Sequence, residues 1–166
     1  MSDVKLNLGC GKDYREGYIN VDLYEDSADQ RFDVKTIPYE DNTVDEILAS
    51  HVIEHFDYHE SVDVLKEWYR VLKPGGKLVL ETPDMLESCR EFVNTDEEHR
   101  VYLLGHFLAQ PWVPGQLHKM LFTETQMRQH LGWAGFDPNK AKRIEPVSKY
   151  IHVYPSRVFL AMEIIK

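Results

Sequence analysis

The sequence is poor in cysteine and has no long apolar run. Its 166 residues include only two cysteines, Cys10 and Cys89, which are too few for a disulfide framework or a cysteine-rich metal site. No segment approaches the roughly 20 apolar residues of a membrane-spanning helix, and the N-terminus lacks the basic and apolar regions of a secretion signal. We therefore expect a protein of the reducing cytoplasm with no membrane partner.

Positive charge is also scarce. Nineteen Lys and Arg residues stand against 28 Asp and Glu residues, so the formal net charge is −9, which disfavours broad binding to nucleic acid. Eight histidines are present, but no H-x-x-x-H pair within a predicted helix and no cysteine cluster argues for a metal site, and none is expected. The length, the ordinary apolar content and the absence of repeats or linkers predict one domain over residues 1–166.

The most informative stretch runs from Val4 to Asp22. Apolar residues alternate with polar ones over residues 4–8, which predicts a strand, and Gly9-Cys10-Gly11 follows as a tight turn. Residues 18–22 predict a second strand that ends at Asp22. A glycine turn after one strand, with an acid at the end of the next, is an arrangement that holds a nucleoside.

The link between these two strands is unusually short. A parallel crossover normally needs a dozen or more residues and a helix, whereas residues 12–17 can form only a turn or an irregular link. Either the first crossover helix is missing, or the two strands pair in an unusual way.

Strand and helix patterns alternate along the rest of the chain and predict an α/β sandwich with a mostly parallel sheet and an antiparallel C-terminal hairpin. A capping-box pattern, Thr123-Glu-Thr-Gln126, opens the last helix, and Gly135 ends it. The predicted strands are residues 29–34, 44–49, 77–82, 141–144 and 158–165, and the predicted helices are residues 59–72, two within 85–119, and 123–134.

Taken together, several motifs resemble the class I S-adenosylmethionine-dependent methyltransferases, a family with a Rossmann-like sandwich. They are Leu-Asn-Leu-Gly-Cys-Gly at 6–11, Val-Asp22, and the stretches at 37–48, 50–55, 67–78 and 122–136. The resemblance implies methyl transfer from S-adenosylmethionine to a small or medium acceptor. The family's usual N-terminal helices are absent here, so the chain resembles a minimal, N-terminally short member. Its pocket is expected to be open, or to be completed by residues 85–119 or by a second subunit of a homo-oligomer.

The resemblance also implies a set of cofactor-binding residues. Gly9 and Gly11 would bound the turn beneath the methionine part, Asp22 would take the ribose hydroxyls, and Asp33 with Val34 would meet the adenine. Asn7 stands where the family often has an acid. The full set is Asn7, Gly9, Cys10, Gly11, Asp22, Leu23, Asp33, Val34, Ser50 and His51.

Fewer residues are candidates for catalysis and for acceptor binding. His55 is the candidate general base because an imidazole titrates near neutral pH, although a histidine that caps the next helix is an equal alternative. Trp112 and His118 are the candidate acceptor contacts, and residues 85–119 are the candidate lid or acceptor-side insertion. A surface histidine is an equal alternative for His118. Glu54 is interpreted either as a residue that orients a neighbour or contacts substrate, or as polar surface, the latter being the more common case.

Two other functions remain open at this stage. The missing crossover helix is compatible with a non-catalytic module of the same fold that serves as an interaction partner. A nicotinamide-dependent enzyme is a weaker alternative, because the fingerprint G-x-G-x-x-G would require glycine at Tyr14.

Overall fold

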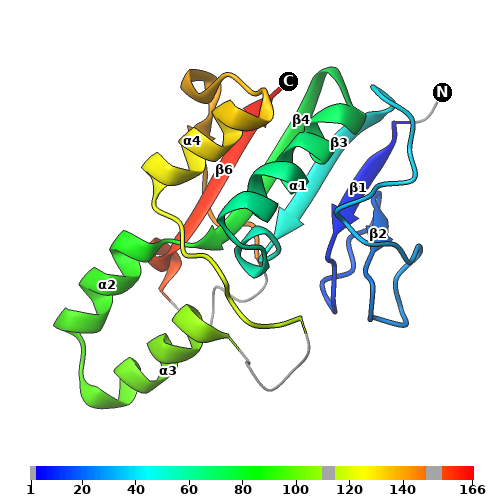
Figure 1. Ribbon diagram of the computed structural model, residues 1–166. Coiled ribbons are helices and arrows are strands. Elements are labelled where there is room, and N and C mark those ends of the chain that lie inside the picture. Colours follow the sequence, from blue (N-terminus) through cyan, green and yellow to red (C-terminus); the bar gives the residue numbers. More distant parts are fainter. Residues whose placement is uncertain (1–2, 110–114, 149–154) are drawn as a thin grey trace.

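A computed structural model describes residues 3–109, 115–148 and 155–166, and one sheet forms its centre (Figure 1). Within these residues the sheet has six strands in the order β2-β1-β3-β4-β6-β5. The first four are parallel, β6 is antiparallel to β4, and β5 is antiparallel to β6 at the edge. This confirms the predicted fold class and the C-terminal hairpin. The strands are β1 (Lys5–Leu8), β2 (Ile19–Val21), β3 (Val44–Ser50), β4 (Leu72–Pro83), β5 (Lys142–Arg143) and β6 (Phe159–Ile165).

Helices α1 (Tyr58–Val71) and α4 (Glu124–Ala134) lie side by side on one face of the sheet (Figure 1). Asp57 caps α1 with a capping box that includes Glu60. Thr123 and Gln126 form the predicted capping box of α4. These helices bury apolar side chains against β3 and β4, so the main core lies between this helix layer and the sheet.

Helices α2 (Met85–Asn94) and α3 (Glu97–Leu108) form a pair beyond the carboxyl ends of the parallel strands (Figure 1). Three short 3-10 turns complete the description: η1 (Ile53–His55), η2 (Pro138–Lys140) and η4 (Ser156–Val158). In the described part of the chain, none of the helices combines the length and apolarity that crossing a membrane requires.

The predicted strand at residues 29–34 is wrong. Only an isolated bridge between Val21 and Gln30 is present, and Asp33 begins a turn in which its carbonyl accepts a hydrogen bond from Thr36. The segment is largely polar and partly exposed, so it offers too little apolar surface to extend the sheet. The sheet of the described residues therefore has six strands, without one at residues 29–34.

The crossover helix between β1 and β2 is absent, yet the two strands pair in parallel, with Leu6 opposite Ile19. Two buried amides hold the short link in place. Asn7 Nδ2 donates to the Asp13 carbonyl at 2.8 Å and to Asn20 Oδ1 at 2.9 Å. Asn20 Oδ1 also accepts from the Arg15 amide at 2.8 Å, and Asn20 Nδ2 donates to the Arg15 carbonyl at 3.0 Å. Asn7 thus helps to hold the short link that stands in place of a helix, because an ionised acid at this position would have no such donors.

Candidate functional site

Two adjoining cavities open at the carboxyl ends of β1 and β3, each of about 350 Å³. We call them the Gly11 cavity and the Asp22 cavity, and they share Gly9, His51 and His55. The candidate site residues along the Gly11 cavity are Asn7, Gly9, Cys10, Gly11, Ser50, His51, His55 and His118. Those along the Asp22 cavity are Gly9, Asp22, Leu23, Asp33, Val34, His51 and His55. Trp112 lies outside the described residues.

The glycine turn separates the two cavities from the core. Gly9 has a φ of +62°, and a Cβ atom there would lie 2.6 Å from Val52 Cγ2. Gly11 has a φ of +47°, and its amide points at the Asp22 carboxylate. Glycine is required at Gly9 for both its backbone conformation and its close approach to Val52.

Asp22 is held by three backbone amides. Its Oδ2 accepts from Gly11 at 2.9 Å, and its Oδ1 accepts from Tyr24 at 2.8 Å and Glu25 at 2.9 Å. The carboxylate therefore has a defined orientation on the wall of the Asp22 cavity, where its remaining lone pairs can accept further hydrogen bonds.

Cys10 is buried between the strand ends, and its amide donates to the Val21 carbonyl at 2.9 Å. Burial, followed by the charge of Asp22, raises the pKa of its thiol to about 11. The thiol is therefore protonated at neutral pH, which agrees with a small residue beside a ligand and not with a nucleophile.

A buried charged group lies under the junction of the cavities. His51 Nδ1 is 3.1 Å from Glu54 Oε1, and His51 Nε2 is 3.2 Å from Glu81 Oε1. Burial by itself would lower the pKa of His51, but the hydrogen bonds with both carboxylates raise it to about 9. Burial opposes ionisation of Glu54, yet pairing with His51 lowers the pKa of that carboxyl to about 2. Two carboxylates thus flank one imidazolium.

His51 also has an unusual backbone, with a φ of +57° in the left-handed region. Its amide donates to the Glu81 carbonyl at 2.8 Å, which holds this conformation at the end of β3. Such strain in a side-chain-bearing residue is typical of functional sites. The interpretation of Glu54 as polar surface is wrong, because its side chain is fully buried and orients His51.

Asp33 and Val34 reach the Asp22 cavity from a turn and not from a strand end. Asp33 Oδ1 accepts from the Lys35 amide at 2.9 Å. The Val34 carbonyl accepts from the indole of Trp68 at 3.0 Å, which ties this turn to α1.

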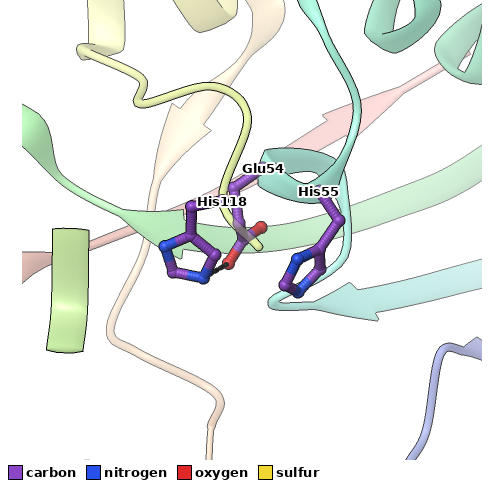
Figure 2. Close-up of side chains that lie close together, drawn as sticks. All are labelled: Glu54, His55 and His118. Carbon is purple, nitrogen blue, oxygen red and sulfur yellow. Dashed lines mark ion pairs between the residues drawn. The ribbon is translucent and has the colours of Figure 1, made fainter. Parts of the chain in front are cut away.

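His55 and His118 lie together at the Gly11 cavity, with ring centroids 5.0 Å apart (Figure 2). The proposed helix-capping role of His55 is wrong, because Asp57 caps α1 and His55 ends η1. His118 is not a surface histidine: its side chain is 7% exposed, and burial lowers its pKa.

Two site residues were not foreseen. Glu81 on β4 joins His51 to the segment at Val147 and Ser148, whose amides donate to its Oε2. Its only signal was a charged residue within the apolar run 78–82. His106 on α3 lines the Gly11 cavity, and burial, with the positive charge of His51, lowers its pKa to about 4. No local pattern marked His106.

The N-terminal part of the chain is similar to known methyltransferase domains. Residues 6–80 match the model of a methyltransferase domain family. A ubiquinone/menaquinone biosynthesis C-methyltransferase from Desulfotalea psychrophila is 33% identical over 79 residues, which cover 46% of this chain and 31% of that protein. An uncharacterized protein from Methanocaldococcus jannaschii is 32% identical over 108 residues, which cover 55% of this chain and 45% of that protein. The matches thus span less than half of the length of these relatives.

A solved structure extends the likeness to the whole fold. The crystal structure of a SAM-dependent methyltransferase from Archaeoglobus fulgidus has a TM-score of 0.62 at 18% identity, and the match covers 99% of this chain and 86% of that chain. Residues 6–80 are therefore similar to a methyltransferase domain family, and the chain as a whole has the fold of this solved SAM-dependent methyltransferase.

Proposed function

We propose that this protein transfers a methyl group from S-adenosylmethionine to a small or medium acceptor molecule. The observation that carries the proposal is the oriented Asp22 carboxylate beside the Gly9–Gly11 turn, in a cleft formed by two joined cavities. This combination suits a ligand with a nucleoside at one end and an amino acid at the other.

The adenosine part is assigned to the Asp22 cavity. Asp22 accepts hydrogen bonds from the two ribose hydroxyls, since a carboxylate with a fixed orientation can accept both. Asp33 and Val34 contact the adenine, and Leu23 gives an apolar wall. The methionine part then enters the Gly11 cavity over the glycine turn, with Asn7 and Cys10 beneath it and Ser50 at its edge.

The sulfonium is assigned to the junction at His51. Beneath this point two buried carboxylates face one imidazolium, so the local charge is negative. A negative potential favours a cationic ligand, and its effect is largest in a poorly solvated cleft. In the assigned orientation, the positive sulfonium of S-adenosylmethionine lies within this negative potential.

The acceptor is assigned to the far side of the Gly11 cavity, next to α3 and residues 115–119. Gly105, His106 and Gln116 line that side, so these segments serve as the acceptor-side wall. The reaction requires mainly that the acceptor atom, the methyl carbon and the sulfur be aligned while water is excluded.

For an acceptor that must lose a proton, His55 is the proposed base. Its Nδ1 lies 3.2 Å from the Leu117 carbonyl, and because a carbonyl only accepts, Nδ1 carries the proton and Nε2 keeps a lone pair. Nε2 takes the proton of a hydroxyl or amine, the freed electron pair attacks the methyl carbon, and S-adenosylhomocysteine leaves.

Calorimetric titration with S-adenosylhomocysteine tests the proposal. We expect one binding site, and we expect Asp22→Ala to weaken binding roughly 10- to 100-fold, because hydrogen bonds to a charged group contribute about 1.5–3 kcal/mol. Asp26→Ala is the matched control, since Asp26 is exposed and pairs with Arg31 on the surface. Absence of heat with folded wild-type protein would refute cofactor binding and favour a non-catalytic module. Unchanged affinity in folded Asp22→Ala would refute the assigned site.

A further inference from the structure

Three potential ligand groups converge at the acceptor end of the cleft. Glu54 and His55 come from η1, and His118 comes from the segment that precedes α4 (Figure 2). One donor atom from each residue lies within 4.8 Å of the other two. Glu54 Oε1 and His118 Nε2 are 3.9 Å apart.

Both imidazoles place Nδ1 against a backbone carbonyl. His55 Nδ1 is 3.2 Å from the Leu117 carbonyl, and His118 Nδ1 is 3.0 Å from the His106 carbonyl. Carbonyl oxygens only accept, so each Nδ1 carries the proton and each Nε2 has a free lone pair. A backbone carbonyl on one ring nitrogen and a metal on the other is the usual environment of a metal-bound histidine.

One carboxylate oxygen of Glu54 accepts no hydrogen bond from the described residues. Its side chain is fully buried, and Oε1 is taken by His51. Among the described residues, Oε2 has no hydrogen-bond partner. A buried carboxylate oxygen without a partner is costly, and a cation at this position would satisfy it.

The main chain holds the cluster in place. The Glu54 carbonyl accepts from the amides of Lys119 at 2.8 Å and Met120 at 3.1 Å. These two bonds fix the segment that carries His118 against η1. The ligand positions are therefore set by backbone hydrogen bonds and not by flexible surface side chains.

We propose that Glu54, His55 and His118 form a binding site for a divalent transition metal, with Zn²⁺ as the first candidate. Two imidazoles and one carboxylate are a donor set that zinc accepts, whereas Mg²⁺ and Ca²⁺ prefer oxygen ligands. In a tetrahedral zinc site the ligand atoms lie about 3.4 Å apart, so small side-chain rotations close the present spacing.

Both histidines line the Gly11 cavity, so a metal bound by them would have a further coordination position accessible from that cavity. A catalytic zinc site has this composition, with three protein ligands and one position open to water or substrate. If the proposed methyl transfer holds, the metal would bind the acceptor oxygen and ease loss of its proton, and His55 would then be a ligand in place of a base. The metal site itself does not depend on methyl transfer.

The test uses the full chain after chelator treatment. Titration with Co²⁺, which reports its ligands by visible absorption, should saturate at one equivalent, and Zn²⁺ should displace it. His118→Ala and His55→Ala should each weaken Co²⁺ binding roughly 100-fold or more, since loss of an outer-shell partner alone costs 10- to 100-fold. His99→Ala is the matched control, because His99 is exposed on α3 and its removal should change nothing.

Circular dichroism shows whether each variant is folded, and the partly exposed His55 gives a second variant if His118→Ala unfolds. No visible bands with folded wild-type protein would overturn the proposal, as would an unchanged Co²⁺ affinity in folded His55→Ala. Calorimetry with S-adenosylhomocysteine on the same metal-free protein tests the cofactor site separately, so failure of one proposal is distinguishable from failure of the other.

Discussion

At the scale of single residues, Gly9 is restrained both by its backbone and by its neighbour. Its φ is +62°, and an added Cβ atom would lie 2.6 Å from Val52 Cγ2. Gly9→Ala should therefore lower the free energy of unfolding by about 2–4 kcal/mol, from left-handed backbone strain and overpacking together. Urea denaturation measures this loss.

Gly17→Ala provides the comparison for this prediction. Gly17 also has a positive φ, +82°, but nothing lies within 4 Å of its Cβ position. Gly17→Ala should lower the free energy of unfolding by only about 1–2 kcal/mol. Equal losses in the two variants would show that contact with Val52 contributes nothing.

Asn7 gives a second prediction at this scale. Its Nδ2 donates to the Asp13 carbonyl and to Asn20 Oδ1 in a nearly inaccessible position, 3% exposed. Asn7→Asp restores the acid common in the family but removes both donors, so it should destabilise the protein by about 1–3 kcal/mol. Thermal unfolding would show this, with the exposed Asn139→Asp as control. A more stable Asn7→Asp variant would contradict the role of Asn7 in holding the short link.

At the scale of elements, the N-terminus of α4 depends on one side chain. Thr123 Oγ1 accepts from the Gln126 amide at 3.3 Å, and Gln126 Oε1 accepts from the Thr123 amide at 3.2 Å. Thr123→Ala should lower the free energy of unfolding by about 1 kcal/mol, because it leaves the Gln126 amide without its hydrogen-bond partner. Urea denaturation of Thr123→Ala and of Thr36→Ala, which changes an exposed loop threonine, would separate capping from loss of a hydroxyl. Equal stability of these two variants would exclude a capping contribution.

The elements that the sequence predicted well are those with local signals. Thr123, Gln126 and Gly135 marked both ends of α4, and the apolar alternation of Val4, Leu6 and Leu8 marked β1. The predicted strand at residues 29–34 was wrong because this segment has no such alternation of apolar residues. Its path is decided by hydrogen bonds from the amides of Asp29 and Gln30 to the Asn20 carbonyl.

At the scale of the whole molecule, the two cavities exist only when the β1, β3 and α3 segments are assembled. A ligand that spans both binds the folded state alone and stabilises it by mass action. S-adenosylhomocysteine at 100 times its dissociation constant should add about 2.7 kcal/mol, which raises Tm by about 5–11 °C for a chain of this size.

Differential scanning fluorimetry measures this shift. Adenosine alone should give a smaller one, because it occupies only the Asp22 cavity. No shift with saturating S-adenosylhomocysteine, or an equal shift with adenosine, would contradict a ligand that extends across both cavities.

The sequence by itself determined the α/β class, the glycine turn and the acid at Asp22, because these depend on residue periodicity and on turn chemistry over a few neighbours. Only the tertiary structure decided that β1 and β2 pair in parallel without a helix, since that pairing rests on two amides that meet when the strands align. Only the tertiary structure brought His118 to Glu54 and His55, because main-chain hydrogen bonds between distant segments place them there. The close pairing of Glu54 with His51 then keeps both groups charged although burial opposes their charges, and this pairing is a property of the folded chain that no local pattern contains.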